Sequence, residues 1–407
     1  MSRVDDLIAE HTPNGVEFRA LGDIARFVRG NGMPKTDLVD EGVGAIHYGQ
    51  IYTRYGVWAT ETISFVAPET AMKLARAQPG DIIITNTSEN VEDVGKAVAW
   101  LGSEPIVTGG HATVIQHDLD PKYLAYWFQS ESFSVQKRGL ATGTKVIDVS
   151  ARQLAKVRLP VPPIEVQREI VGVLYKFTRL EAELEAELEA RRRQYDYYAG
   201  VLLEANDEVP RVRFGDVATI VRGASPRPIQ NFITDGADGV PWIKIGDVPA
   251  RGKYITGTTQ RVSPAGAGKS RRVYPGDFVL SNSMSFGRPY ISRIEGCIHD
   301  GWLAISAFED SYISDYLYYL LRSTPVQDEF ARRAGAGTVK NLNAEIVRSV
   351  EVPLPPKDVQ ARVVELLDKF DALVNDLSVG LPAELLARRK QYAHYRDQLF
   401  AFPEAAA

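Results

Sequence analysis

The sequence VRLPVPPIEVQREIV at residues 157–171 occurs a second time as VEVPLPPKDVQARVV at residues 350–364, with seven of fifteen positions identical. The offset of 193 between these stretches also relates LGDIARFVRG at 21–30 to FGDVATIVRG at 214–223, where six of ten positions are identical. A repeat period near 195 residues is far longer than that of a solenoid repeat. The chain is therefore an internal duplication of one domain-sized unit.

The two copies agree at their ends and differ in the middle. Residues 31–120 and 224–313 match poorly, and the alignment register drifts within them, which indicates insertions that are later compensated. Two copies that share a frame and diverge in the middle predict one scaffold that carries two different recognition surfaces.

The composition is that of an ordinary globular protein. Of 407 residues, 44% are hydrophobic and 24% are charged, which predicts two to four domains with sizeable cores. No apolar run has the roughly 18 residues needed to span a bilayer, and the first residues contain no secretory signal. The single cysteine, Cys297, excludes an internal disulfide and a cysteine-based metal site, so we expect a reducing cytoplasm. The net charge of −5 argues by itself against a polyanionic partner, but only a local basic face would decide that question.

The first part of each copy is expected to be α+β. GVGAIHYGQIYTRYGVWAT (42–60) is rich in strand-forming residues. A Pro-Gly-Asp turn at 79–81, and again at 275–277, precedes an apolar run. Residues 121–139 and 314–333 have apolar spacing near 3.6, which predicts helices.

A proline pair then opens a long helix in each copy. Proline is tolerated in the first turn of a helix, and after 162–163 the apolar spacing continues for about 40 residues, through LEAELEAELEA at 180–190. The second copy starts at 355–356 and meets Gly380 and Pro382, so we expect its helix to break there. The apolar face of each long helix is too long to be buried by its own domain. We therefore expect the two helices to pack as an antiparallel coiled-coil pair with a pseudo-two-fold relation.

These motifs resemble those of a known family. The GD-(I/V)-A and VRG openings, the PLPP-x-x-x-Q helix start and LLDKFDALVNDLSVGLPAELLARRKQYAHYRDQLF (366–400) look like the specificity subunit of type I restriction–modification systems. The resemblance covers essentially the whole chain, although the first copy replaces the Gly-Pro break by the continuous LEAE repeat. It implies two homologous α/β target recognition domains separated by a pair of long antiparallel helices. The domains are then 1–162 and 206–355, with spacer helices at 163–205 and 356–407.

The resemblance also implies a function. Each target recognition domain would read one half of a bipartite, asymmetric site in double-stranded DNA, and the helix pair would fix the gap between the halves. The chain itself would be non-catalytic and without a cofactor or metal. Its partners would be two adenine-N6 methyltransferase subunits, which use S-adenosylmethionine, and two restriction/translocase subunits, which use ATP and Mg²⁺. No membrane partner is expected. Two alternatives are a duplicated helical adaptor that bridges identical partners without reading bases, and the recognition chain of a bifunctional restriction enzyme that cuts outside its site.

The sequence offers no catalytic motif of its own. GAGKS (266–270) has Ser263 where a phosphate-binding loop would have its first glycine, and the turn at 275–276 leaves no room for the helix that must follow, so it is read as a basic loop. The Asp120-Pro121-Lys122 stretch is a nuclease-like fragment without a partner acid. Neither an Asn/Asp-Pro-Pro-Tyr methyltransferase signature nor a glycine loop for S-adenosylmethionine is present.

Candidate DNA contacts are polar or basic residues, most of them at corresponding places in the two copies. Hydroxyls, amides and arginines read base edges or hold phosphates, and a nearby lysine suits phosphate. The alternatives are a polar turn for most of them and a salt bridge inside the fold for the two arginines that precede a glycine. The candidates are Arg29, Lys35, Asn86, Thr87, Ser88, Thr144 and Lys145 in the first copy, and Arg222, Arg227, Ser281, Asn282, Ser283, Arg288, Thr338 and Lys340 in the second.

Two further groups lie outside this set. The first lies on the strand expected to open each divergent block, and its aromatic members are predicted to be core: Tyr48, Gln50, Trp242 and Lys244. The second lies in and just after RRRQY (191–195) and RRKQY (388–392) on the long helices. These residues could bind phosphate, but they are predicted to bind a partner subunit: Arg192, Tyr195, Tyr198, Arg389, Tyr392 and Tyr395. The glutamates of the LEAE repeat are expected to form one solvated helix face that would repel DNA.

Overall fold

The computed structural model describes residues 3–204, 209–248, 252–282, 286–335, 341–376 and 378–405. These residues form two compact units, the first made of Met1–Glu185 with Glu384–Ala407 and the second of Ala186–Ala383. The C-terminal helix of the second copy of the repeat therefore belongs to the first unit. Among the helices of the described residues, none combines the length and apolar character needed to cross a membrane.

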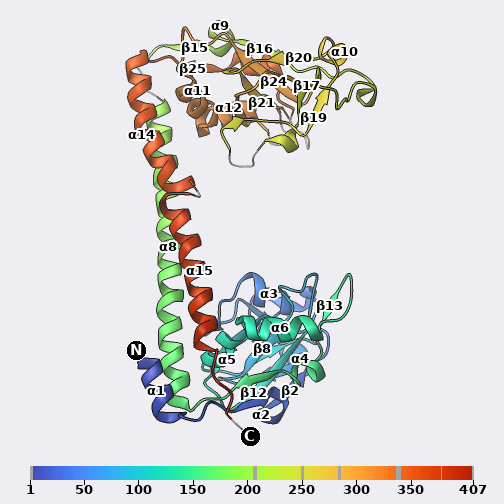
Figure 1. The fold of residues 1–407 in the computed structure, drawn as a ribbon, viewed down its shortest axis with the longest axis vertical. Helices are drawn as coiled ribbons and strands as arrows, with labels where there is room; N and C mark the ends of the chain where they lie inside the picture. The colour runs from blue at the N-terminus through green and yellow to red at the C-terminus, as the bar shows by residue number, and fades with distance from the viewer. Residues whose placement is uncertain are drawn as a thin grey trace. The chain divides into compact units, whose positions relative to one another are not determined.

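The first unit contains two five-stranded sheets, in the orders β2-β12-β8-β10-β5 and β3-β6-β4-β11-β7 (Figure 1). Within them β5 is parallel to β10 and β4 is parallel to β11, while the other neighbours are antiparallel. The strands are short, and β8 and β10 are buried on both faces. The strand bounds are β2 (Ala25–Arg29), β3 (Leu38–Val39), β4 (Val43–Ile46), β5 (Trp58–Ala59), β6 (Ser64–Val66), β7 (Ala75–Ala77), β8 (Ile82–Thr85), β10 (Ala97–Trp100), β11 (Ile106–Thr108) and β12 (Ala112–His117).

The second unit repeats this topology strand by strand. Its sheets have the orders β16-β24-β21-β22-β18 and β19-β17-β23-β20, with β18 parallel to β22 and β17 parallel to β23. Among the described strands, β3 and the β9–β13 pair of the first unit have no counterpart in the second. The duplication and the α+β class predicted from the sequence are confirmed. The strand bounds are β16 (Thr219–Arg222), β17 (Val240–Ile243), β18 (Tyr254–Ile255), β19 (Gln260–Val262), β20 (Arg271–Val273), β21 (Phe278–Ser281), β22 (Pro289–Ser292), β23 (Gly296–Ile298) and β24 (Trp302–Ser306).

Small paired strands close each unit. β1 (Phe18–Ala20) pairs with β14 (Arg158–Pro160), and at the same place in the repeat β15 (Arg211–Arg213) pairs with β25 (Glu351–Pro353). The short helices and turns between the strands are α2 (Leu21–Ile24), η1 (Lys35–Asp37), α3 (Tyr48–Thr53), α4 (Pro68–Ala71), α7 (Ala151–Leu154), α9 (Phe214–Val217), η2 (Ile229–Asn231), η3 (Ile245–Asp247), α10 (Pro264–Ala267) and α13 (Ala344–Ser349).

The helices predicted at 121–139 and 314–333 are present, each divided into two. α5 (Pro121–Trp127) and α6 (Glu131–Leu140) occupy the first range, and α11 (Ser314–Arg322) and α12 (Thr324–Arg333) occupy the second. In the first pair Ser130 caps the start of α6, because its hydroxyl accepts the backbone N–H of Phe133. The aromatic residues of α5 and α11 are buried and belong to the core.

The prediction of strands throughout 42–60 is wrong for its middle. Residues 48–53 form α3 between β4 and β5. His47 caps this helix, since its Nδ1 accepts the Gly49 N–H at 3.2 Å and its own N–H donates to the Gln50 side chain at 3.0 Å. This reciprocal cap satisfies backbone groups that a strand would have paired with a neighbour, so a sequence rich in strand-forming residues adopts one and a half helical turns.

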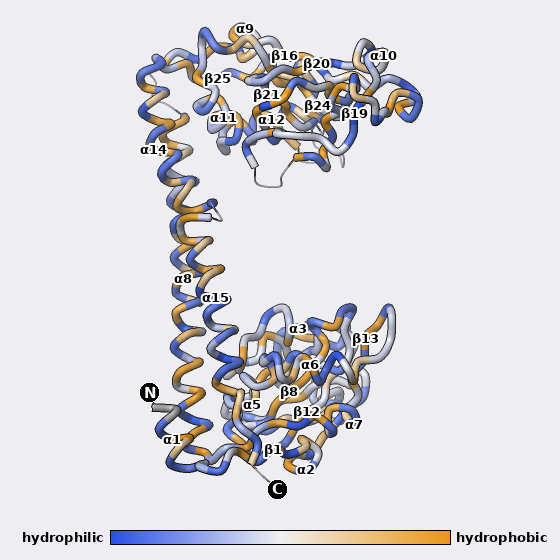
Figure 2. Tube along the Cα trace, viewed as in Figure 1, coloured by the Kyte–Doolittle hydropathy of each residue, from blue (hydrophilic) through white to orange (hydrophobic). Residues whose placement is uncertain are grey.

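The long helices agree with the sequence prediction. α8 (Ile164–Glu204) is continuous over 41 residues, whereas the second copy forms α14 (Lys357–Asn375) and α15 (Gly380–Leu399); Figure 2 shows hydrophobic residues recurring among polar ones along α8. Gly380 has a φ of +78°, and a Cβ there would lie 2.5 Å from the Ala372 carbonyl oxygen, so this break requires glycine. Pro382 falls in the first turn of α15, where its missing N–H costs nothing.

Within each unit the helices pair antiparallel. In the first unit, residues further along α15 contact residues earlier on α8: Arg389 bonds Glu181 at 2.6 Å, and Tyr395 stacks on Phe177 with ring centroids 5.6 Å apart. In the second unit Tyr198 of α8 stacks on Phe370 of α14 at 6.4 Å, which reproduces the Tyr395–Phe177 contact at the corresponding positions. The antiparallel packing predicted from the apolar stripes is confirmed on both sides of the repeat.

The glutamine of the PLPP-x-x-x-Q motif fastens each long helix to its unit. Gln167 accepts the Asp120 N–H at 2.9 Å and donates to the Pro162 carbonyl at 2.8 Å. Gln360 accepts the Ile313 N–H at 2.8 Å and donates to the carbonyls of Pro355 and Ser311, both at 2.9 Å. Both side chains are buried, so they satisfy backbone groups that water does not reach.

The two ends of the chain meet in the first unit. α1 (Arg3–His11), which the sequence analysis did not predict, leads to Val16, whose N–H donates to the Pro403 carbonyl at 2.8 Å and whose carbonyl accepts the Ala405 N–H at 3.0 Å. Phe400 and Phe402 pack into the core of this unit beside Tyr123. The first unit therefore depends on a segment that follows the second copy in sequence.

Candidate nucleic-acid interface

One edge of the main sheet in the first unit brings most of the predicted DNA-contact residues of that copy together. Because β12 is antiparallel to both β2 and β8, the ends of β2 and β8 meet the start of β12 at this edge, with Arg29 opposite Thr113 and Thr85 opposite Ala112. β9 (Thr87–Ser88) follows β8 and pairs with β13 (Ile147–Asp148). We call this the recognition edge of the first unit.

The pairing of β9 with β13 places an exposed hairpin tip beside this edge. Thr142 and Asp148 exchange both backbone hydrogen bonds, and Thr144 and Lys145 are exposed at the tip between them. Gly143 has a φ of +103°, and a Cβ on it would collide with the Val146 carbonyl. The turn thus needs glycine, and it presents Thr144 and Lys145 to solvent at the recognition edge.

The repeated arginines have the same role in both units. Arg29 donates from Nε to the Gly110 carbonyl at 2.6 Å, and Arg222 donates from Nε to the Asp300 carbonyl at 3.1 Å. The two side chains hold the turns that lead into β12 and β24, and both residues remain exposed. The structure therefore shows a hydrogen bond to the backbone in place of the predicted alternative of an internal salt bridge.

Asn86 and Asn282 are wrong as predicted DNA contacts, because their side chains are buried and used by the fold. Asn86 is 0% exposed; its amide donates to the Val149 carbonyl at 2.8 Å and accepts the Thr113 hydroxyl at 2.6 Å. Asn282 is 4% exposed and donates to the Asp300 carbonyl at 2.9 Å. These asparagines tie the end of the strand to neighbouring segments and have no surface to offer a base.

The serines beside them are buried as well. Ser88 is 6% and Ser281 0% exposed, and the Ser281 hydroxyl accepts the Arg288 N–H at 3.0 Å. Both are corrections to the predicted contact set. Thr87 remains half-buried and its hydroxyl lies 2.9 Å from His111 Nδ1. Ser283, Thr338 and Lys340 lie outside the described residues.

An imidazole and aromatic cluster, which sequence reasoning missed, occupies the recognition edge of the first unit. The rings of His47 and Tyr48 are 4.5 Å apart, and those of Tyr48 and His111 are 5.0 Å apart. Burial lowers the pKa of His47, and the charges of the nearby Lys35 and His111 lower it further. The predicted contact Lys35 therefore lies near polar rings that can donate and accept hydrogen bonds. No sequence signal links His47 to His111, because they lie far apart in the divergent block.

The second unit has different chemistry at the corresponding edge. Asp300 accepts the Ser225 hydroxyl at 2.8 Å and pairs with Arg227 at 3.1 Å, and the Ser225 hydrogen bond and Arg227 lower its pKa despite partial burial. The Arg227 side chain is 80% exposed. His299 lies between the rings of Trp242 and Trp302, at 6.2 and 6.0 Å. This recognition edge carries an ion pair, whereas that of the first unit is lined by imidazole and phenol rings.

The remaining sequence motifs are structural. Trp242 is buried on β17 as predicted, but Tyr48 and Gln50 lie on α3 and Lys244 follows β17, so these three are not on a strand. GAGKS ends the helix α10 and precedes a strand, which is the reverse of the order in a phosphate-binding loop. Asp120 caps α5 through the N–H groups of Lys122 and Tyr123. Among the described residues no group of histidine, cysteine, aspartate or glutamate could hold a metal ion.

The predicted partner-binding residues make contacts within their own units. Arg389 pairs with Glu181 and Glu185, and the Tyr392 hydroxyl donates to Gln129 at 3.2 Å. Arg192 donates to the Val374 carbonyl at 3.4 Å. Tyr195 is only 8% exposed, which corrects its prediction as a partner contact. Tyr198 and Tyr395 keep 43% and 41% of their surface exposed.

The glutamates of the LEAE repeat do not form a single face. Glu181 and Glu185 point to α15, where Arg389 neutralises them, while Glu183, Glu187 and Glu189 pair with arginines of α8 itself. Positions two apart on a helix lie about 200° apart around the axis. The alternating pattern therefore distributes the negative charge between the α8–α15 interface and solvent, which corrects the predicted single acidic stripe.

Comparisons with known proteins agree with this architecture. A family model described as "Type I restriction modification DNA specificity domain" matches residues 13–190 and again 206–387. The EcoR124I/EcoR124II specificity subunit of Escherichia coli is 32% identical over 266 residues, which cover 61% of this chain and 64% of that protein. A putative specificity subunit of Haemophilus influenzae, S.HindORF215P, is 28% identical over 64% of this chain and 68% of its own length.

Solved structures share the fold. One chain of a type I R-M system, solved to explain complex assembly and conformational transition, has a TM-score of 0.72 at 18% identity and covers 95% of this chain and 98% of its own. The HsdS subunit of Thermoanaerobacter tengcongensis has a TM-score of 0.52 at 18% identity and covers 96% of this chain and 97% of its own. With two matches to the family model, one for each copy of the repeat, the chain belongs to the family of type I restriction–modification DNA specificity proteins.

Proposed function

We propose that this chain is the DNA sequence-specificity subunit of a type I restriction–modification complex, in which each unit reads one half of a bipartite, asymmetric site. The observation that carries the proposal is the pair of recognition edges. One strand framework occurs twice, and it presents His47, Tyr48 and His111 in the first unit but Arg227, Asp300 and His299 in the second. Different donors and acceptors on one scaffold are what reading two different half-sites requires.

The remaining parts of the proposal concern the helices and the partners. The helix pairs would act as a spacer that sets the unspecified gap between the half-sites, in the way that the geometry of dimers sets half-site spacing. The chain would be non-catalytic and bind no cofactor or metal. It would assemble with two adenine-N6 methyltransferase subunits that use S-adenosylmethionine, and with two restriction/translocase subunits that use ATP and Mg²⁺.

The test is single-molecule sequencing of DNA from cells that express this chain with the methyltransferase encoded beside it. We expect N6-methyladenine at a split, asymmetric motif, and none in cells that lack the chain. Exchanging residues 31–140 for the matching block of another family member should change one half of the motif and leave the other half intact. Absence of chain-dependent methylation, in a stable complex with an active methyltransferase, would contradict the proposal and favour an adaptor that reads no bases.

A further inference from the structure

A basic cavity lies in the second unit where the helix pair meets the recognition domain. It has a volume of about 340 Å³ and is formed by α8, α11, α14 and the strands β18 and β22 with the residues before them. Four cations and one carboxylate line it, so its lining carries an excess of positive charge. The lining residues are Arg192, Lys253, Arg288, Tyr318, Tyr319, Arg322, Asp371 and Asn375.

The arginines of this cavity are held in place by neutral groups. The Arg322 guanidinium donates to the Tyr318 hydroxyl at 3.0 Å and lies over that ring at 5.1 Å. Arg288 lies over the buried Tyr290 ring at 5.5 Å. Arg192 donates to the Val374 carbonyl at 3.4 Å. Since a guanidinium has five N–H donors, each side chain is oriented and still has donors for a ligand.

Only part of this charge is neutralised inside the protein: burial acts to lower the pKa of Arg322, but the nearby Tyr318, Tyr195 and Asp371 raise it. Lys253 pairs with Asp315 at 2.5 Å, but within the part of the chain that the structure describes none of the three arginines has a carboxylate within ion-pair distance. Asp371, the carboxylate of the lining, accepts the Asn375 amide at 2.9 Å. Three oriented guanidiniums around one cavity form a site for an anion with several acceptor oxygens.

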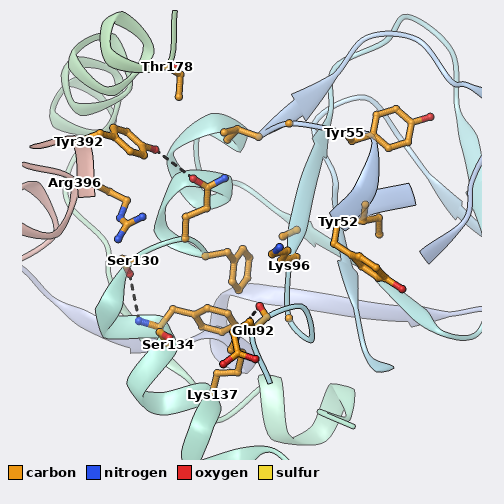
Figure 3. Close-up of a pocket in the computed structure, with 18 of the residues that line it drawn as sticks. Tyr52, Tyr55, Glu92, Lys96, Ser130, Ser134, Lys137, Thr178, Tyr392 and Arg396 are labelled. Atoms are coloured by element: carbon orange, nitrogen blue, oxygen red, sulfur yellow. Dashed lines mark hydrogen bonds between the residues drawn. The ribbon is translucent and has the colours of Figure 1, made fainter. Parts of the chain in front are cut away.

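The corresponding cavity of the first unit is different. Figure 3 shows Tyr392 and Arg396 reaching into it from α15, opposite Lys96 and Lys137. Its cations are engaged within the protein: Lys96 with Asp93 at 2.7 Å, Arg396 with Asp397 at 3.0 Å, and Lys137 with the Val94 carbonyl at 2.8 Å.

Single exchanges at matched positions account for much of this difference. Gln129 stands in the first unit where the offset of 193 places Arg322 in the second. Arg389 of the first unit corresponds to Arg192 of the second, and it is neutralised by Glu181 and Glu185. The second unit has Val374 at the position that corresponds to Glu181, and Arg192 donates to its backbone carbonyl. The excess of unpaired cations is thus particular to the second unit.

We propose that the cavity lined by Arg192, Arg288 and Arg322 binds backbone phosphate of DNA next to the half-site of the second unit. The inference rests on the proposed function and extends it from base reading to a backbone anchor. Arg288 connects the two regions, because its N–H donates to Ser281, the residue before Asn282 at the recognition edge. A phosphodiester on the strand being read therefore has a short path to this cavity, which favours DNA over a carboxylate of a partner protein.

The test uses the full chain in complex with its methyltransferase and a duplex oligonucleotide of arbitrary sequence, with binding measured over a series of salt concentrations. Arg322→Gln introduces the residue that the first unit already has at this position, and Arg288→Gln is a second, independent variant. The slope of log K against log salt should fall by about 0.9 for each phosphate that the variant no longer neutralises. Affinity should fall by about 5- to 10-fold, equally for target and arbitrary sequences, as expected for an arginine that binds phosphate.

Arg138→Gln is the matched control, because Arg138 lines the first unit's cavity but is paired with Glu131 at 2.6 Å, and it should leave the slope unchanged. Arg322→Lys keeps the charge and should retain most of the slope, which separates phosphate binding from a folding defect. An unchanged slope in both Arg→Gln variants would overturn the proposal. Weaker binding of the methyltransferase with an unchanged slope would instead identify a protein carboxylate as the occupant. The half-site preference of the wild-type complex is measured separately, so loss of that preference would count against the proposed function alone.

Discussion

The turn that enters β12 in the first unit is Gly109-Gly110-His111, and the turn that enters β24 in the second unit is His299-Asp300-Gly301. The backbone has the same role in both turns, because the carbonyl of the second residue accepts a hydrogen bond from the repeated arginine. The side chains differ: the His111 ring packs against Tyr48, while Asp300 forms an ion pair with Arg227. When main-chain hydrogen bonds hold an edge, its side chains are available to diverge without loss of the fold.

The helix junctions show the same principle with a different outcome. In both units a buried glutamine fastens the long helix, and a tyrosine stacks on a phenylalanine across the pair. Around these shared contacts, the first unit neutralises its arginine with two glutamates and the second leaves three arginines facing a cavity. Three further experiments test how far the two units are equivalent.

The largest effect is expected at the buried glutamines. Gln360→Met would leave three backbone groups without partners and should destabilise the second unit by roughly 3–5 kcal/mol. Gln167→Met leaves two such groups and should cost the first unit roughly 2–4 kcal/mol. Hydrogen exchange of peptides from each unit measures both losses. The exposed Gln391→Met is the control, and equal losses in the two units would break the proposed ranking.

A smaller effect is expected from acid on the first unit. Burial lowers the pKa of His117 to about 4, and its Nδ1 accepts the Leu119 N–H at 3.1 Å, as a neutral ring does. The unfolded chain would bind this proton near pH 6.5 and the folded unit near pH 4, so stability is present above pH 6.5 and is lost as the pH falls from 6.5 to 4. The loss should reach at most about 3 kcal/mol.

The matched variant for this prediction is His117→Asn, which keeps an acceptor for the Leu119 N–H but cannot take up a proton. Unfolding followed at about pH 7 and about pH 5 should show a smaller acid loss in the variant than in the wild type. The second unit has Ala307 at the position that corresponds to His117. The pH dependence of the second unit should therefore be the same in the variant and the wild type. An identical acid loss in variant and wild type would contradict the assignment to His117.

The smallest effect is expected at the interface between α8 and α15 in the first unit. Arg389→Gln removes the ion pairs with Glu181 and Glu185, but these side chains are partly exposed. We expect a loss of about 0.2–1 kcal/mol at low salt that shrinks as salt is added. Thermal unfolding at two salt concentrations measures it. A loss of several kcal/mol in the free energy of unfolding would show that these ion pairs, and not the buried glutamine, hold the helix to the first unit.

Several features followed from the sequence by itself, because their causes are local. The duplication is visible in identical residues at a constant offset. Proline fixes φ at the start of α8 and α14, and the positive φ of Gly380 ends the continuous helix in the second copy. The Pro-Gly-Asp turns and the 3.6-residue apolar spacing depend on neighbours a few positions away, so the chain displays them without its fold.

Tertiary structure alone decided which polar residues face solvent. Asn86 and Asn282 had the chemistry of base-reading residues, yet their partners come from strands and turns far away in sequence, and both are buried. His47 and His111 meet only because β4 and β12 lie in adjoining sheets of one unit. The arginine cavity is likewise lined by residues from three helices and from the segments before the parallel strands β18 and β22. Burial and charge pairing are properties of these long-range contacts, and in the divergent blocks the register between the copies drifts, so no pattern along the chain could specify them.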